Sequence, residues 1–312
     1  MANNQMKIKV LDLYCGAGGL SLGFKREGFE VIGIDNNPWA TDVFKVNRIG
    51  GLQRMDLSKE TAHVDCDIIT GGPPCRPWSS VNVCKRGEKH PDYNLVRRFF
   101  DHVIEMQPKA FLLENVPPLA SDPVYAELIE KVRREGYSVA NGNELYSDHG
   151  STMRRRRLIT AGFRDFGADA SAFFRFLEAK KCNTPPTVRE VIEKYEKYGR
   201  GDFRDHEWPE LRTIEKYTNR YKTGKYGWFR LDYDKQSPSF GNIMKTYILH
   251  PMAGQNGVPL RVISVREAME IMGFPSDFVF PAEMGLSMRY QMVADAVSPS
   301  VSEKFARVMK VL

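Results

Sequence analysis

The first 35 residues restrict the fold of this chain more than any other stretch. Residues 7–14 (KIKVLDLY) are an apolar run typical of a strand, and the turn 15–19 (CGAGG) leads into residues 20–27, whose apolar positions have helical spacing. Gly28 is placed to end that helix, and a second strand, 30–34, ends at Asp35. The order of strand, glycine turn, helix, strand and acid predicts a nucleotide-binding βαβ unit.

The chemistry of this unit favours a nucleotide-like ligand without naming it. Glycines let a ligand approach the backbone, and a carboxylate at Asp35 can accept hydrogen bonds from both hydroxyls of a ribose. The glycines do not spell G-x-G-x-x-G, which argues against a dinucleotide. A turn that serves only helix–sheet packing is the alternative. Asp56 follows a short third strand and could reach the amine of an adenine, although a solvated loop aspartate fits the sequence as well.

A fourth strand near residues 67–70 is followed by a stiff loop with a cysteine, GGPPCRPWSS at 71–80. Glycines permit a sharp turn and prolines fix φ near about −65°, so the thiol of Cys75 is held on a rigid loop beyond a strand end. That is where reactive groups lie in open α/β sheets. On the loop alone, a nucleophile and a small buried apolar side chain are equally consistent with Cys75.

Two further polar segments lie at the ends of strands of the same predicted sheet. The strand 110–113 ends at Glu114, before the proline-stiffened residues 115–118, and the arginine run 154–157 leads into the apolar strand 158–163. Because side chains alternate along a strand, two of the four arginines are expected to share one face. A solvated basic turn is the other interpretation.

Composition places few limits on the protein. It has 312 residues and a net charge of +6, and its five cysteines include no C-x-x-C pair. We expect an intracellular, cytoplasmic protein with free thiols, no membrane span and no structural metal site. One large domain with a smaller insert suits this length.

The alternation of strands and helices breaks down between about residues 165 and 235. A capping box at Thr187 and Glu190 predicts a helix over 188–198. The window 212–230 then interleaves six basic residues with five aromatic ones against a single acid, which suits the phosphates and bases of a nucleic acid. Aromatic residues that form the core of a small β-rich subdomain are the alternative, and both can hold together.

Taken in order, the motifs resemble one known family. They are DLYCGAGGLSLGF (12–24), Asp35, GGPPCRPWSS (71–80), ENVPP (114–118), the arginine run 154–157, RVISVREAMEIMGFP (261–275) and ADAVSP (294–299). In this order and spacing they resemble the DNA cytosine-C5 methyltransferases. The resemblance covers nearly the whole chain except about 165–235, which corresponds to the family's variable target-recognition region.

The resemblance implies the fold and its division. The expected class is α/β, a Rossmann-like sheet with helices on both faces, plus a smaller, irregular, partly β target-recognition domain. Residues 1–164 and 261–312 are expected to form the catalytic domain, and residues 165–260 the target-recognition domain.

The resemblance also implies the reaction and its residues. S-adenosylmethionine is the expected methyl donor and duplex DNA, with a flipped-out cytosine, the expected substrate. The expected catalytic residues are Cys75, Glu114, Arg155 and Arg157. The expected cofactor-binding residues are Tyr14, Gly16, Gly18, Gly19, Asp35, Asn36, Asp56, Pro74 and Asp295. The expected DNA-binding residues are Arg76, Ser79, Lys85, Arg86, Arg220, Lys222, Lys225, Trp228 and Arg230.

The sequence departs from the family pattern at three places. Arg76 and Met153 stand where the family usually has glutamine, and Ala294–Asp295 replaces a Gly-Asn pair. None of these touches Cys75 or Glu114, so the expected activity stands. The tRNA-methylating branch of the family and a non-catalytic DNA-binding relative are the alternatives. A monomer, nucleoid-associated through DNA and accompanied by a restriction endonuclease for the same site, completes the prediction.

Overall fold

The computed structural model describes residues 7–79, 86–164, 169–210, 214 and 228–312, which divide into two compact units. Unit 1 comprises residues up to Leu145, Arg156–Lys181 and Val301–Leu312, and unit 2 comprises Tyr146–Arg155 and Cys182–Ser300. The division into a catalytic domain, residues 1–164 and 261–312, and a target-recognition domain, residues 165–260, remains a prediction. Within the described residues, no helix is long and apolar enough to cross a membrane.

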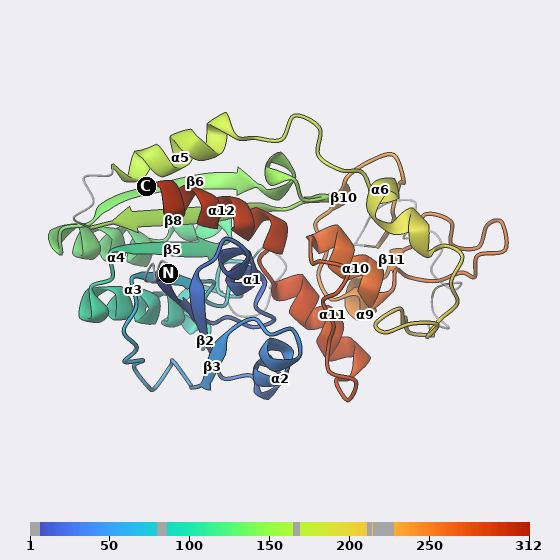
Figure 1. Ribbon diagram of the computed structural model, residues 1–312, viewed down its shortest axis with the longest axis horizontal. Helices are drawn as coiled ribbons and strands as arrows, with labels where there is room; N and C mark the ends of the chain where they lie inside the picture. Colours follow the sequence, from blue (N-terminus) through green and yellow to red (C-terminus); the bar gives the residue numbers. More distant parts are fainter. Residues whose placement is uncertain (1–6, 80–85, 165–168, 211–213, 215–227) are drawn as a thin grey trace, which may run out of the picture. The chain divides into compact units, whose positions relative to one another are not determined.

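Unit 1 is built on a seven-stranded sheet with the order β3-β2-β1-β4-β5-β8-β6 (Figure 1). The first five strands of this order are parallel to one another, and β8 runs antiparallel to both β5 and β6. The strands are β1 (Lys9–Leu13), β2 (Glu30–Asp35), β3 (Gly51–Arg54), β4 (Ile68–Gly71), β5 (Ala110–Asn115), β6 (Ser138–Leu145) and β8 (Arg156–Phe163). The central strands β4 and β5 are buried along their whole length, as expected for strands covered on both faces.

Helices cover both faces of this sheet (Figure 1). The helices of unit 1 are α1 (Gly19–Arg26), α2 (Pro38–Val46), α3 (Leu95–Met106), α4 (Pro123–Arg134), α5 (Ala170–Ala179) and α12 (Pro299–Val311), whose first two residues belong to unit 2. On one face, edge-to-face rings of Phe99, Phe100 and Phe111 join α3 to β5. On the other face, Phe173 of α5 lies between Phe163 and Phe305. The predicted α/β class with helices on both faces is confirmed.

The last helix completes unit 1 by packing directly on the first. A Cβ added at Gly23 would lie 2.3 Å from Ser302 Oγ, so the two helices approach closely only because residue 23 is glycine. Ser302 Oγ donates a hydrogen bond to Leu20 O, and Arg307 forms an ion pair with Glu27. Helices α1 and α12, far apart in the sequence, are therefore joined in one core.

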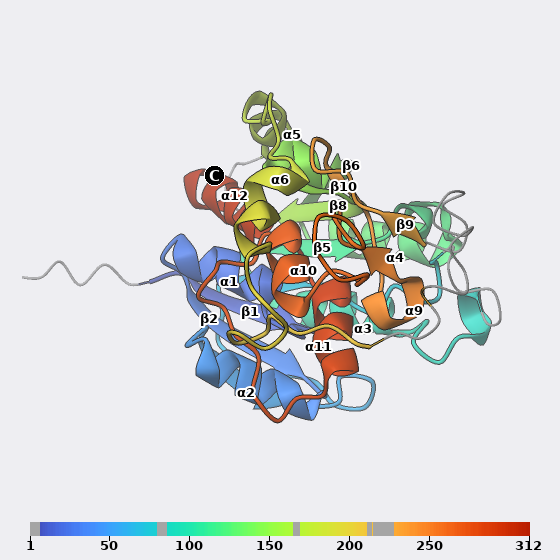
Figure 2. The same ribbon diagram turned by 90° about the vertical axis from the view of Figure 1, so that its right-hand side faces the viewer.

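Unit 2 is smaller, irregular and partly β, as predicted. Its helices are α6 (Val188–Ile192), α9 (Ile243–Thr246), α10 (Val265–Met272) and α11 (Leu286–Asp295), and α10 packs against α6 and α11 (Figure 2). Two short parallel pairs join β7 (Met153–Arg154) to β10 (Ser237–Pro238) and β9 (Phe229–Arg230) to β11 (Ile248–Leu249). The helix predicted over 188–198 is shorter, because α6 ends at Ile192 and a 3₁₀ turn, Glu193–Tyr195, follows.

Buried ion pairs lie among the buried apolar side chains of unit 2. The fully buried carboxylate of Glu267 accepts two hydrogen bonds from Arg261, at 2.7 and 2.8 Å, and reaches back to the Ser264 N–H in a capping box at the start of α10. Arg289 of α11 bonds the buried Asp205 at 3.2 Å. Paired and hydrogen-bonded charges of this kind tolerate burial, whereas the removal of one partner would be costly.

Candidate active site

The glycine turn after β1 has a backbone that only small residues adopt readily. Gly16 and Gly18 have φ values of 52° and 76°, and Tyr14 has a φ of 61°, which is uncommon for a residue with a side chain. A Cβ at Gly18 would lie 2.7 Å from the Ile49 side chain, whereas one at Gly16 would meet nothing within 4 Å. The turn is thus packed at Gly18 and open at Gly16, where a ligand could approach.

Asp35, at the end of β2, holds this turn from the neighbouring strand. One carboxylate oxygen accepts from the Gly16 N–H at 2.8 Å and the other from the Asn37 N–H at 2.8 Å. Burial raises the pKa of Asp35, against the opposing effect of these backbone donors. The structure therefore brings together the predicted residues Gly16, Gly18, Gly19 and Asp35, with Asn36 exposed beside them.

A second carboxylate below the turn was not among the predicted site residues. Asp12 of β1 is almost fully buried and accepts hydrogen bonds from Ser21 Oγ of α1 at 2.5 Å and from Thr70 Oγ1 of β4 at 3.1 Å. Burial raises the pKa of Asp12 to about 6, although the two hydroxyls oppose the shift. In the sequence, an acid inside an apolar strand is the signal that could have drawn attention to it.

Tyr14 and Asp56 have structural contacts besides their predicted role at an adenine. The Tyr14 hydroxyl donates to Leu95 O, at the start of α3, at 3.1 Å, and burial raises the pKa of this phenol. Asp56 accepts from the N–H and the hydroxyl of Ser58 and pairs with Lys59 at 3.1 Å, and the Ser58 hydroxyl is the main cause of its lowered pKa. Both therefore shape the loops on which they lie.

The Cys75 loop begins where the fully buried strand β4 ends at Gly71. The Asn115 side chain donates to Pro73 O at 3.0 Å, and the N–H groups of Trp78 and Ser79 both donate to Cys75 O at 3.0 Å. These bonds close a tight turn around the cysteine, whose side chain is half-buried, as is that of Pro74. The stiff loop predicted from the prolines is thus stiffened further by hydrogen bonds.

Glu114 lies beside this loop because β4 and β5 are neighbours. Gly71 pairs with Leu113, and a Cβ at Gly72 would lie 3.3 Å from Glu114 Oε2. On the other side, the register of β5 and β8 brings Arg157 to the same carboxylate, with Nε 2.9 Å from Glu114 Oε1. Three predicted catalytic residues, Cys75, Glu114 and Arg157, therefore come from three adjacent strands at one edge of the sheet.

Arg155 and Asp295 belong to unit 2. Arg155 is nearly buried, and its guanidinium donates to Ala294 O at 2.7 Å. Asp295, the last residue of α11, is exposed and accepts from the Gln291 side chain at 2.8 Å. The arginine run is therefore divided between the two units, and its bond to the residue before Asp295 links two of the motifs recognised in the sequence.

Comparison with known proteins identifies the family of this chain. The family model for C-5 cytosine-specific DNA methylase matches residues 8–311. The chain belongs to this family. It is a DNA (cytosine-5) methyltransferase, and its substrate is DNA.

Named relatives and solved structures agree with the family. The chain is 27% identical to the type II methyltransferase M.MthTI of Methanothermobacter thermautotrophicus, over 98% of each chain. It is 29% identical to M.FnuDI of Fusobacterium nucleatum, over 97% of this chain and 94% of that protein. The fold resembles the S. pombe Dnmt2 methyltransferase, with a TM-score of 0.73, 19% identity and coverage of 98% and 99%.

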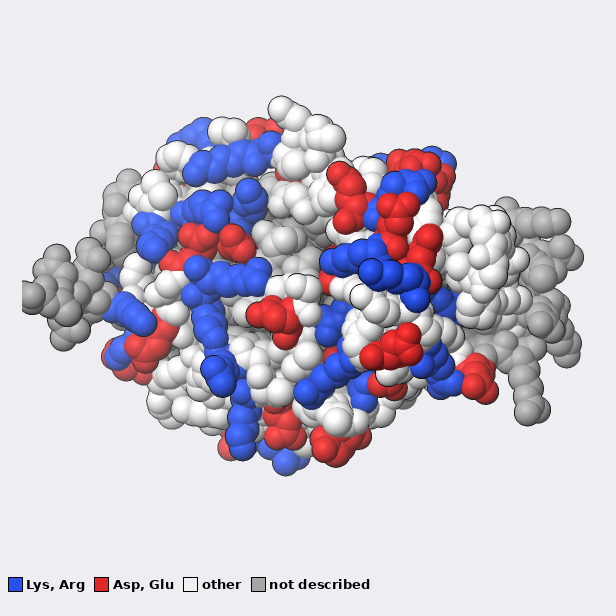
Figure 3. Space-filling view, turned by 45° about the vertical axis from the view of Figure 1, so that its right-hand side comes forward, with Lys and Arg blue, Asp and Glu red and all other residues white. Residues whose placement is uncertain are grey.

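The residues predicted to contact DNA are spread over both units of the methyltransferase. Arg76 is exposed, Ser79 is half-buried, and exposed Arg86 donates to Trp78 O at 3.4 Å. Trp228 is buried against Tyr247, and Arg230 donates to the carbonyls of His250, Pro251 and Ala253. Lys85, Arg220, Lys222 and Lys225 lie outside the described residues. On the face shown in Figure 3, basic and acidic side chains are interspersed.

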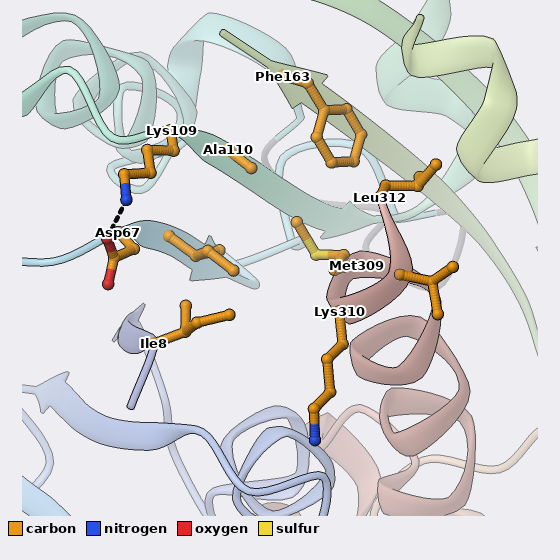
Figure 4. Close-up of a pocket in the computed structure, with 10 residues that line it drawn as sticks. Ile8, Asp67, Lys109, Ala110, Phe163, Met309, Lys310 and Leu312 are labelled. Carbon is orange, nitrogen blue, oxygen red and sulfur yellow. Dashed lines mark ion pairs between the residues drawn. The ribbon is translucent and has the colours of Figure 1, made fainter. Parts of the chain in front are cut away.

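A pocket of about 270 Å³ lies at the opposite edge of the sheet, and none of the predicted site residues lines it (Figure 4). Its walls come from residues that precede β1, β4 and β5, including Ile8, Asp67 and Lys109, and from Met309 and Leu312 at the end of the chain. Reactive groups in open α/β sheets lie at the carboxyl ends of the strands, so this pocket is not the active site.

Proposed function

We propose that this methyltransferase transfers a methyl group from S-adenosylmethionine to C5 of a cytosine flipped out of duplex DNA, through a covalent bond between Cys75 Sγ and C6 of the base. The observation that carries the proposal is the neighbourhood of the Cys75 loop, Glu114 and Arg157 on β4, β5 and β8. A thiol beside a hydrogen-bonded carboxylate suits addition to a pyrimidine ring that must be polarised at the same time.

The glycine turn fits S-adenosylmethionine. The open space at Gly16 admits a ligand to the backbone, and the Asp35 carboxylate beside it retains lone pairs for ribose hydroxyls. Tyr14 and Asp56 are assigned to the adenine, and Asn36, Pro74 and Asp295 to the remaining contacts. When bound, the cofactor supplies an electrophilic methyl group.

Cys75 opens the reaction because cytosine C5 alone is a poor nucleophile. The thiolate adds to C6, and the electrons of the C5–C6 double bond move toward C5. With the cofactor bound, C5 would take the methyl carbon as the bond from that carbon to the sulfonium sulfur breaks, and S-adenosylhomocysteine would be the leaving group. A base then takes the C5 proton, the C5–C6 double bond forms again, and the Cys75 thiolate is expelled from C6, which regenerates the enzyme.

Glu114 and Arg157 stabilise the ring while this charge moves. Glu114 is assigned to hydrogen-bond the protonated N3 of the cytosine, and its ion pair with Arg157 holds the carboxylate in one orientation. Arg155 and Arg157 are both assigned to the active site, where one of the two hydrogen-bonds O2 of the base. The cytosine must leave the duplex to reach these groups, which costs about a few kcal/mol.

The target site is expected to be short, about four to six base pairs, and read by residues between 165 and 260. Arg76, Ser79, Lys85 and Arg86 are assigned to DNA beside the flipped base, and Arg220, Lys222, Lys225, Trp228 and Arg230 to the target sequence. We further propose a cytoplasmic, nucleoid-associated monomer. Its relatives are named type II methyltransferases, which supports a companion restriction endonuclease for the same site.

The test uses DNA of diverse sequence in which 5-fluorocytosine replaces cytosine. Fluorine at C5 blocks proton removal, so the protein with S-adenosylmethionine should form a stable adduct with DNA. Cys75→Ser should abolish the adduct, and the control Cys66→Ser should retain it, since burial raises the pKa of Cys66 to about 12 and disfavours its thiolate. Wild-type protein that forms no adduct with any such DNA would contradict the mechanism.

The same purified protein can be used to find the target sequence and to test tRNA as the alternative substrate. Sequencing of methylated cytosines in ordinary DNA treated with the enzyme gives the recognised sequence. A parallel incubation with tRNA should give no methylation, and preferential methylation of tRNA would replace the proposed substrate.

A further inference from the structure

Asp122 joins three elements of unit 1 through one carboxylate. It is the N-cap of α4, where Oδ1 accepts from the Val124 N–H at 3.0 Å. The same oxygen accepts from the Tyr93 hydroxyl at 2.8 Å, and Oδ2 accepts from the indole Nε1–H of Trp78 at 2.7 Å. A helix cap needs only the first of these bonds, so the two aromatic donors require another explanation.

The Trp78 indole is directly connected to the Cys75 turn. Trp78 lies three residues after the cysteine, and the backbone N–H of Trp78 donates to Cys75 O at 3.0 Å. Its side chain is only 5% exposed and lies 5.5 Å from the Tyr93 ring, measured between ring centroids. A large buried ring with a short hydrogen bond to a fixed acceptor has little freedom to turn, and the backbone that carries it is restrained as well.

The Tyr93 phenol extends this contact toward the glycine turn. Tyr93 lies two residues before Leu95, the first residue of α3, whose carbonyl accepts from the Tyr14 hydroxyl. Burial and the bond to Asp122 raise the pKa of Tyr93 to about 12, so this phenol keeps its proton and remains a donor. Asp122 thus lies between the loop of the cysteine and the helix that touches the turn after β1.

We propose that Asp122 is a positioning residue for the Cys75 nucleophile, acting through the indole of Trp78. The inference rests on the proposed role of Cys75. The carboxylate does not touch the reacting atoms. Instead it fixes the 75–78 turn against the N-terminus of α4, so that the thiol is presented in one orientation beside Glu114. A misplacement of about 1 Å in a reacting group can cost about a hundredfold in rate.

The substitution Asp122→Asn separates this role from helix capping. The amide oxygen can replace Oδ1, so the cap at Val124 and the bond from Tyr93 persist. The amide nitrogen replaces Oδ2 and faces the Trp78 N–H, donor against donor. Asp169→Asn is the matched control, because Asp169 caps α5 by accepting from Ser171 N–H at 3.0 Å. Trp78→Phe removes the same N–H from the other side and keeps an aromatic ring.

The decisive measurement is the single-turnover rate of adduct formation with 5-fluorocytosine DNA at saturating S-adenosylmethionine and DNA. We expect Asp122→Asn and Trp78→Phe to lower this rate by about tenfold to a hundredfold. The KM for S-adenosylmethionine, the Kd for DNA and the thermal unfolding midpoint should stay close to those of the control Asp169→Asn. A wild-type rate in Asp122→Asn, or an equal loss in Asp169→Asn, would overturn the inference.

A second readout does not depend on catalysis. In ¹⁵N-labelled protein, the indole N–H resonance of Trp78, identified by its loss in Trp78→Phe, should exchange with solvent at least tenfold faster in Asp122→Asn. Unchanged protection would show that Asp122 does not hold the indole, and would overturn the inference.

If wild-type protein forms no adduct, the proposed chemistry is wrong, and the alkylation rate of Cys75 by iodoacetamide replaces the first measurement. An equal alkylation rate in Asp122→Asn would then also overturn it.

Discussion

Replacing Asp12 by asparagine should change how the stability of this protein depends on pH. Asp12 lies inside the sheet, about 1% exposed, with Ser21 and Thr70 as hydrogen-bond donors, and the negative charge of Asp35 adds to the effect of burial on its pKa. Burial raises its pKa from 3.8 to about 6. At about 1.4 kcal/mol per pH unit, the folded protein binds this proton more tightly than the unfolded chain by roughly 3 kcal/mol.

The direction in which pH changes the free energy of unfolding depends on whether the folded or the unfolded state binds the Asp12 proton more tightly. Below pH 3.8 the carboxyl is neutral in both states, and its full contribution to stability is present. As the pH rises toward about 6, the unfolded chain loses the proton first, so the free energy of unfolding falls. Above that value the carboxylate is charged in both states and its cost is constant.

Urea unfolding of the wild type and of Asp12→Asn at several pH values between 4.5 and 7.5 tests this reasoning. Asparagine does not titrate, and its amide can bond the same two hydroxyls. The variant should therefore gain stability relative to the wild type as the pH rises, by about 2 kcal/mol over this range. Asp42→Asn, on the exposed surface of α2, is the control. A difference between the wild type and Asp12→Asn that is constant with pH would refute the reasoning.

Three other substitutions, two of them with a comparison variant, have distinct expected outcomes. Glu114→Gln should lower the methyl-transfer rate at saturating substrates by about 10²- to 10⁴-fold while folding is retained, and a rate above a tenth of wild type would contradict its role. Gly23→Ala places a Cβ 2.3 Å from Ser302 Oγ and should cost about 1–3 kcal/mol in urea unfolding, whereas Gly51→Ala, with its nearest atom 3.7 Å away, should cost less. Arg230→Ala removes a donor to three carbonyls and should lower both the unfolding free energy, by about 1–3 kcal/mol, and DNA affinity. Arg76→Ala, at an exposed site, should lower affinity alone.

The opening βαβ unit could be predicted because its signals are local. Apolar runs, the glycine turn and Gly28 lie within 35 residues, and Gly28 indeed has the φ of 91° expected after a helix end. The α/β class then follows from the alternation of strands and helices, which the structure confirms in unit 1. Such features depend on the sequence itself more than on distant contacts.

Some helices were not predicted or were given the wrong length. We did not predict α2, α5 or α11, although Asn37 followed by Pro38 is a start signal for α2 and only α11 has a weak apolar period. The capping box at Thr187 correctly marks the start of α6 but cannot mark its end. Beyond Ile192 the chain instead satisfies tertiary contacts, with Tyr195 hydrogen-bonded to Glu270 and Tyr233 to Glu196.

The sheet topology makes the reactive residues easier to predict than the residues that support them. Cys75 follows the end of β4 and Glu114 lies near the carboxyl end of the parallel strand β5, so their proximity follows from the order of the strands. Trp78 and Asp122 are 44 residues apart, and Asp12 and Thr70 are 58 apart, and no periodicity relates either pair. The sequence therefore indicated Asp122 as a helix cap, which the structure confirms, but did not indicate the long-range hydrogen bonds of either carboxylate. The Asp122 carboxylate nevertheless restrains the turn that follows Cys75, so its substitution should affect the reaction without touching the reacting atoms. Asp12 joins α1 and β4 to β1, so its substitution should act on stability.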